Sequence, residues 1–220
     1  MFSTFRFVIV LAGTVALLGL WPGGSALAAT VDVVIETELL AGRSAALAFD
    51  LLDGDGTLSS AVTVGNFALP GGSLGGAAAI GGASGSLSAE VVLTDSEPFN
   101  EWLQYAELGA SMRFSLEIAS EFSGGPDGPA DKFSFYLLNG DAASPGFLQP
   151  LFATNDPSGA DALFSIILGA DPVVENFAAL MVPPEATWTA EVRTVPLPSG
   201  LSLFVPALAL LARGLRRRSA

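Results

Sequence analysis

Apolar and polar side chains alternate along several short segments of this chain, and the alternation restricts what it can fold into. In residues 111–119 the apolar members are Met112, Phe114, Leu116 and Ile118, and the residues between them are polar or charged. Successive side chains of a β-strand point to opposite faces of a sheet, so a period of two indicates strands with one buried face. Clusters of Gly, Pro, Asp and Asn separate these segments, as in an antiparallel sandwich.

We therefore predict an all-β fold, a single antiparallel β-sandwich of jelly-roll-like type. The predicted strands cover residues 31–38, 44–52, 60–69, 86–94, 111–119, 132–138, 162–168 and 186–194. Residues 97–109 fit a helical period better and predict either a short helix or an irregular strand crossing an edge. Residues 65–85 contain eight glycines and predict a flexible loop between two strands. No Lys follows their glycines, so this segment is not a P-loop.

The first 29 residues predict a secretory signal peptide with a short apolar helix. Arg6 precedes an apolar run over residues 7–21, and small residues follow at Ala26 and Ala28. This order is that of a signal peptide exported by the Sec machinery and cleaved after Ala28, or less favourably after Ala29. The alternative is a permanent N-terminal anchor, but the run is short for a membrane span.

The last 26 residues, 195–220, predict a second targeting segment. It begins with the motif Val195, Pro196, Leu197, Pro198, Ser199 and Gly200, continues with a mostly apolar run over 201–212, and ends with Arg213, Arg216, Arg217 and Arg218. The arginines would stay on the cytoplasmic side and stop translocation. As a helix, the run would reach only about 18 Å of a hydrocarbon core that is ~30 Å thick. Such a short transmembrane helix favours recognition and removal, and the alternative is a lasting anchor.

The order of proline motif, apolar helix and arginine cluster resembles the PEP-CTERM class of bacterial sorting signals, in its VPLPA-type variant. Leu197 stands where the commonest form of the motif has Glu. The resemblance implies a membrane-embedded exosortase-type transpeptidase as a partner. It also implies export to the cell surface or extracellular matrix of bacteria that make exopolysaccharide and biofilm. Segments 49–56, 62–67, 93–101 and 133–138 resemble a group of such proteins with an uncharacterised β-rich ectodomain, from which no catalytic residues carry over.

Residues 30–194, the predicted ectodomain, are strongly acidic. They hold four basic and 22 acidic side chains, and 4 − 22 gives a net charge of −18. Such a surface repels nucleic acid and anionic lipid, and we predict neither as a partner. The chain contains no Cys and no His, which excludes disulfides, thiolate zinc sites and a Ser–His–Asp triad.

The segment from Asp53 to Thr57, with sequence Asp-Gly-Asp-Gly-Thr, is the most specific local motif. Carboxylates spaced by glycines can converge on a hard cation, so we predict weak Ca²⁺ binding by Asp53 and Asp55. A complete EF-hand loop is excluded because Leu58 and Val64 occupy its Gly and Glu positions. The alternative is a plain β-turn, in which Asp and Gly are also favoured.

Three further aspartates are secondary candidates for this cation site. Asp50 could join the cluster from the preceding strand. Asp127 and Asp131 follow a turn-rich Gly/Pro segment and are weaker candidates. We predict no cofactor other than this Ca²⁺.

These observations favour a non-enzymatic, exported surface or matrix protein. The first alternative is a carbohydrate-binding module or adhesin for extracellular polysaccharide. It could use aromatic side chains to stack on sugar rings, although these are more often core residues: Trp102, Tyr105, Tyr136 and Trp188. The second alternative is a glycan hydrolase, which requires two suitably spaced carboxylates.

Overall fold

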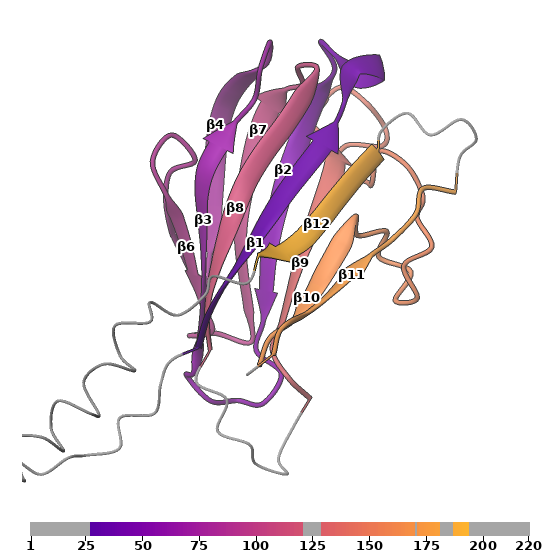
Figure 1. Ribbon diagram of the computed structural model, residues 1–220. Helices are drawn as coiled ribbons and strands as arrows, with labels where there is room; N and C mark the ends of the chain where they lie inside the picture. Colours follow the sequence, from indigo (N-terminus) through magenta and orange to yellow (C-terminus); the bar gives the residue numbers. More distant parts are fainter. Residues whose placement is uncertain (1–26, 121–128, 170, 181–186, 194–220) are drawn as a thin grey trace, which may run out of the picture.

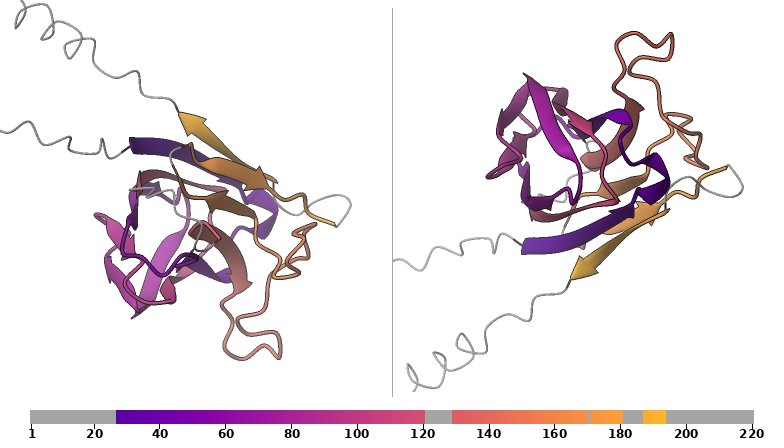
Figure 2. Two further views of the ribbon diagram at one scale, coloured as in Figure 1. Left: turned by 90° about the horizontal axis from the view of Figure 1, so that it is seen from below. Right: turned by 90° about the horizontal axis from the view of Figure 1, so that it is seen from above.

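The computed structural model describes residues 27–120, 129–169, 171–180 and 187–193, which form two six-stranded antiparallel sheets packed face to face (Figure 1). The first sheet has the order β12-β1-β8-β3-β6-β5, and the second has the order β11-β10-β9-β2-β7-β4. The prediction of an all-β sandwich is confirmed for these residues. Figure 2 shows the two layers seen from below and from above.

The strand bounds follow the predicted segments closely in the middle of the chain. The first sheet contains β12 (Thr187–Arg193), β1 (Leu27–Glu36), β8 (Ser111–Ser120), β3 (Ser60–Ala68), β6 (Val91–Thr94) and β5 (Gly82–Gly85). The second contains β11 (Val173–Asn176), β10 (Phe164–Ile167), β9 (Lys132–Asn139), β2 (Ser44–Leu52), β7 (Phe99–Glu107) and β4 (Ser73–Ile80). The 3-10 turn η1 (Glu38–Leu40) is the only helical element in the described part of the chain. Among those residues no helix has the length and apolar character to span a bilayer.

The inward-facing side chains of both sheets fill the space between them. Phe49 of β2 lies at the centre, with ring centroids 5.0 Å from Phe135 and 5.5 Å from Phe114. The alternating apolar residues that predicted β8 and β9 are all buried in this core: Met112, Phe114, Leu116, Ile118, Phe133, Phe135 and Leu137. The apolar residues that recur with a period of two in the sequence therefore form the inner face of the sandwich.

The prediction for residues 97–109 is wrong. They form the regular strand β7, which lies between β2 and β4 inside the second sheet rather than at an edge. Trp102 and Ala106 face the main core, whereas Leu103 faces outward into a small second cluster with Ala46 and Ala48. Because polar residues lie on the inner face of β7, at Asn100 and Gln104, and the apolar Leu103 lies on its outer face, the period of two is obscured.

The prediction of a flexible loop over residues 65–85 is also wrong. This stretch contains the end of β3 and the whole of β4 and β5. Two of its glycines stand where the backbone needs a positive φ or a close approach to another segment. Gly81, with φ +61°, connects β4 in the second sheet to β5 in the first. Gly85, with φ +111°, ends β5 where an added Cβ would collide with the Glu90 carbonyl oxygen. Glycine here permits strand geometry and does not indicate flexibility.

Two predicted strands are three or more residues longer than the observed ones, and β11, besides β4 and β5, was not predicted as a strand. Residues 86–89 form a turn in which Ala89 N–H donates to the Ser86 carbonyl at 2.9 Å, so β6 begins only at Val91. The segment 162–168 contains β10 over four residues. The short strand β11 completes the second sheet on that side.

Two asparagine side chains connect the sheets, one on each side of the sandwich. Asn100 of β7 accepts from Gly82 N–H of β5 at 2.7 Å. Asn176 of β11 both accepts from Ala190 N–H and donates to the Ala190 carbonyl of β12, each at 3.0 Å. A side-chain amide thereby substitutes for backbone pairing where the two sheets come closest.

The predicted terminal segments lie mostly outside the described residues. This applies to both predicted terminal helices, Ala26, the motif at residues 195–200, and the four C-terminal arginines. Ala28 and Ala29, at the predicted cleavage position, belong to β1 and pair with Ala119 and Ile118 of β8.

Candidate functional site

The end of β2 and the start of β9 meet at the lower end of the sandwich in Figure 1, and the residues there bring together carboxylates from two distant segments. Asp53 and Asp55 lie in the loop after β2, and Asp131 immediately precedes β9. One carboxylate oxygen from each of the three lies within 4.8 Å of the others. β2 and β9 are neighbours, with Leu52 opposite Lys132, so the end of one strand and the start of the other meet at one point.

Backbone hydrogen bonds fix one oxygen of each carboxylate. Gly56 N–H donates to Asp53 Oδ1 at 2.6 Å, and Gly54 N–H donates to Asp131 Oδ1 at 2.8 Å. Thr57 donates to Asp55 Oδ1 from its backbone N–H and its hydroxyl, at 2.8 and 2.6 Å. These bonds use Oδ1 in every case and orient the loop. Oxygen donors of this kind suit Ca²⁺, whose coordination shell of about 6–8 oxygens would be completed by water or carbonyl groups.

The negative charges of the carboxylates at this end of the sandwich repel one another. Burial raises the pKa of Asp131, and the negative charges of Asp55 and Asp95 raise it further, against hydrogen bonds from Ser60 and Gly54 that lower it. Asp131 is only 4% exposed. A divalent cation would remove this repulsion, because it favours the ionised form of every carboxylate around it.

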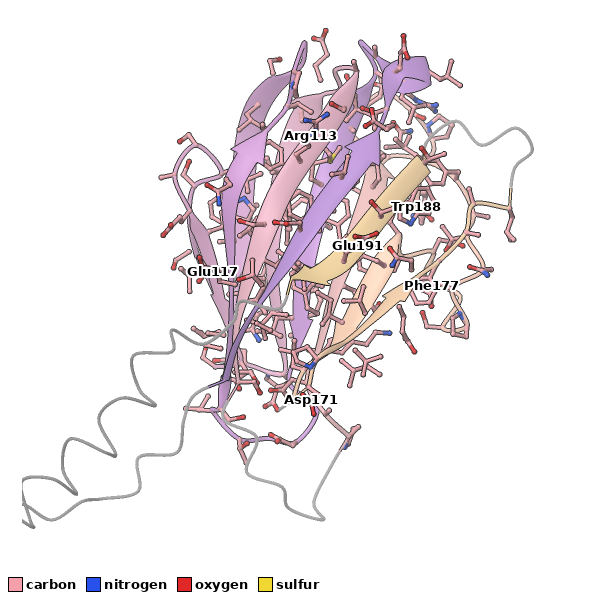
Figure 3. The ribbon with its side chains drawn as sticks, viewed as in Figure 1. Arg113, Glu117, Asp171, Phe177, Trp188 and Glu191 are labelled. Carbon is pink, nitrogen blue, oxygen red and sulfur yellow. The ribbon has the colours of Figure 1, made fainter. Side chains whose placement is uncertain are left out.

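A shallow pocket of about 480 Å³ adjoins the carboxylates. Its lining is rich in hydroxyl groups and comprises Leu58, Ser59, Ser60, Ala61, Thr94, Asp95, Ser96, Ala119 and Ser120. Buried Asp95 accepts from the backbone N–H groups of Ser59 and Ser60, both at 2.7 Å. Ser60 connects the two features, since it also hydrogen bonds to Asp131. Asp171, between β10 and β11, lies at the same end of the molecule (Figure 3).

The structure brings together some of the aspartates singled out from the sequence, while cation binding by them stays a prediction. Asp53 and Asp55 lie together as expected, and Asp131 joins them. Asp127 lies outside the described residues. Asp50 does not belong to the group. Asp95 was missed, although it directly follows β6 at the same end of the sandwich, and only strand pairing reveals that proximity.

Asp50 instead forms a second feature on the outer face of the second sheet. It lies in mid-strand on β2, directly opposite Glu101 of β7 and Ser134 of β9. Burial, and to a lesser extent the charge of Glu101, raises the pKa of Asp50 to about 8. Burial also raises the pKa of Glu101. Asp50 Oδ1 is buried with no hydrogen-bond partner in the described part of the chain. The pair was not singled out from the sequence, because its two members are 51 positions apart.

The four aromatic residues considered for sugar stacking divide into two groups. Trp102 is buried in the main core, and Trp188 packs against that core with its Nε1 donating to the Leu163 carbonyl at 2.6 Å. Tyr105 and Tyr136 lie on the outer face of the second sheet, half-buried against the small cluster. Tyr105 stacks on Phe147 with centroids 6.2 Å apart. Only the two tyrosines offer ring surface outside the core.

Comparison of the chain with protein-family models, curated proteins and solved structures found no match.

Proposed function

We propose that the chain is an exported, non-enzymatic surface or matrix protein whose sandwich binds Ca²⁺ through Asp53, Asp55 and Asp131. The observation that carries the cation site is the convergence of these three carboxylates from two segments of the chain. The adjoining hydroxyl-lined pocket supports extracellular polysaccharide as the class of partner at this end.

Export and sorting rest on the two terminal segments of the sequence. The proposal is that Sec exports the chain, that the apolar run 201–212 enters the membrane transiently, and that an exosortase-type transpeptidase removes the tail. The pairing of Thr30 with Arg193 supports this scheme, because it places the start and the end of the sandwich side by side. Both segments can then be trimmed at one end of the sandwich, with the N-terminal cut falling in the first residues of β1.

The mass of the protein isolated from its native host tests the processing scheme. We expect an N-terminus at Ala29 or Thr30 and a C-terminus that lacks the arginine cluster. Replacing Pro196 and Pro198 with Ala should leave membrane insertion intact and cause an unprocessed form to accumulate. Mature protein that retains Arg213 to Arg218 would contradict removal and indicate a simple anchor.

Calorimetry tests the cation site. Ca²⁺ should release or absorb heat with a Kd of about 10⁻⁴–10⁻³ M, the range of extracellular modules. Asp131→Asn, or Asp53→Ala with Asp55→Ala, should abolish the signal. Asp141→Asn is the matched control, since Asp141 also accepts a turn hydrogen bond, from Ala143 N–H, but lies outside the cluster. If no binding is found at millimolar Ca²⁺, the segment from Asp53 to Thr57 is a plain turn and not a cation site.

The Asp50–Glu101 pair favours a glycan hydrolase as a second candidate. A carboxylic acid held protonated near neutral pH beside a second carboxyl group is what general acid catalysis of glycoside cleavage requires. Release of reducing sugar from the host polysaccharide would support this function, and Glu101→Gln should abolish it. A glycan array that finds binding without release would favour a carbohydrate-binding module or adhesin.

We also infer a jelly-roll-like arrangement for the sandwich. Strands β1 to β4 alternate between the two sheets, and strands β6 to β9 alternate again. Such alternation supports two successive Greek keys wrapped around one core.

A further inference from the structure

One side of the sandwich carries no charge in an otherwise strongly acidic protein. Residues 56–89 form an unbroken stretch without Asp, Glu, Lys or Arg. The stretch contains strands β3, β4 and β5, and the last two lie at the ends of their sheets on the same side of the molecule. The opposite side, formed by β11 and β12, carries Glu175 and Glu191.

Strand β4 is an edge with an unused side. Among the described strands it pairs with β7 alone, and all eight of its residues are exposed. An edge strand presents alternate backbone N–H and C=O groups to solvent, where they can pair with another strand. A bulge between Leu74 and Ala77 interrupts the pairing with β7, and Gln104 Nε2 donates to the Gly75 and Gly76 carbonyls there. The part from Ala77 to Ile80 is a regular edge.

The other three edges are shorter, charged or already engaged. β5 and β11 contain four residues each. The Asn176 side chain connects β11 to β12 by two hydrogen bonds. β12 carries the charged residues Glu191 and Arg193. Short length, charge and coverage are the usual protections of edge strands. β4 carries no charge and no described strand covers its free side, so its bulge and the four-residue length of its regular part are its only protections among the described residues.

We propose that β4 pairs antiparallel with β4 of a second copy of this chain, joining the two second sheets into one continuous sheet. A twofold axis makes such an interface self-complementary, so the same strand serves both partners. Two copies of an acidic protein repel each other wherever acidic side chains meet. The uncharged side formed by β4 and β5 allows approach without that cost. Leu74 and Ile80, 38% and 51% exposed, would be covered by the partner strand.

The repulsion that remains between acidic side chains of the two copies predicts how dimerisation depends on salt concentration. Glu101 and Glu107 of β7 lie opposite Ile80 and Ser73, one strand away from the interface. Their charges would oppose a second copy, and added salt screens them. Association should therefore strengthen with ionic strength. This inference depends on the described strands and is independent of Ca²⁺ binding and of terminal processing.

Sedimentation velocity of the protein isolated from its host tests the proposal. The wild type should pass from monomer to dimer as its concentration rises, at lower concentration in high salt. Ala78→Lys and Ala78→Glu each place a charge on the outer face of β4 and should keep the protein monomeric. An equal mixture of the two variants should dimerise again, because the opposite charges then lie opposite or next to each other. Thr189→Lys on β12, at the opposite side of the sandwich, is the matched control and should dimerise as the wild type does.

Recovery of the dimer in the mixture cannot arise from misfolding of either variant, so it separates pairing from a folding defect. The proposal is overturned if the wild type stays monomeric at every concentration and salt tested. It is equally overturned if Ala78→Lys associates as strongly as the wild type, or if the mixture is no better than either variant alone.

Discussion

Replacing Asp50 should remove a pH dependence from the stability of the fold. Asp50 faces outward from mid-β2, where burial and the neighbouring Glu101 raise its pKa from 3.8 to about 8. In the folded protein this carboxyl group keeps its proton at neutral pH. In the unfolded chain it is in water and loses the proton above about pH 4.

The direction in which stability changes with pH follows from the number of protons that each state binds. Between pH 3.8 and about 8 the folded state holds a proton that the unfolded state has lost. The contribution of Asp50 is therefore complete below the unfolded pKa, falls as pH rises, and levels off above the folded pKa. Each pH unit in this interval lowers the free energy of unfolding by up to ~1.4 kcal/mol. From pH 5 to pH 7 the loss is roughly 3 kcal/mol, a large part of a typical domain stability of about 5–15 kcal/mol.

The test compares the wild type with Asp50→Asn by urea unfolding at several pH values, followed by tryptophan fluorescence. Asn keeps the shape of the side chain but does not titrate. The free energy of unfolding of the variant should therefore change less with pH, and its difference from the wild type should grow in the variant's favour up to about pH 8. The slope of this difference, rather than its absolute value, is the measured quantity.

Asp171→Asn is the control for the loss of one carboxyl group, because Asp171 is exposed at the surface. Asp131 also has a raised pKa, but it titrates in both proteins and cancels in the difference, whereas Glu101 interacts with Asp50 and its change is part of the measured effect. Parallel curves for the wild type and Asp50→Asn between pH 5 and pH 8 would refute the reasoning.

Three further substitutions test the fold by urea unfolding. Phe135→Ala leaves a cavity among the core rings and should lower the free energy of unfolding by about 3–5 kcal/mol. A loss below about 1 kcal/mol would contradict the central position of Phe135 in the core. Asn176→Ala removes both bonds to Ala190 and should cost roughly 1–3 kcal/mol, and an unchanged midpoint would show that they do not hold the sheets together. Gly85→Ala should cost at least about 1 kcal/mol because of its positive φ and the Glu90 carbonyl, whereas Gly76→Ala, with open space around it, should be nearly neutral.

Strand β8, whose polar residues contrast with a buried apolar face, could be predicted from the sequence, and β7, which mixes polar and apolar residues on both faces, could not. β8 carries exposed Arg113 and Glu117 between its buried residues, and both lie on the front sheet in Figure 3. β7 lacks this contrast because Leu103 and Tyr105 pack against a second cluster outside the main core. That cluster exists only once β2, β7 and β9 lie side by side, so its effect on the residue pattern could not be anticipated.

The sequence by itself determined the all-β class, the central strands, the polar turn at Asp53 and Asp55, and the acidic surface, since these follow from side-chain period and composition. Tertiary structure decided that Asp131 joins the turn, that Asp50 is half-buried opposite Glu101, and that β4 is an uncharged edge. These three facts concern residues that are far apart along the chain or a strand's place in its sheet. The pairing of distant strands sets them, and it depends on the free energy of the whole packed core rather than on any local pattern.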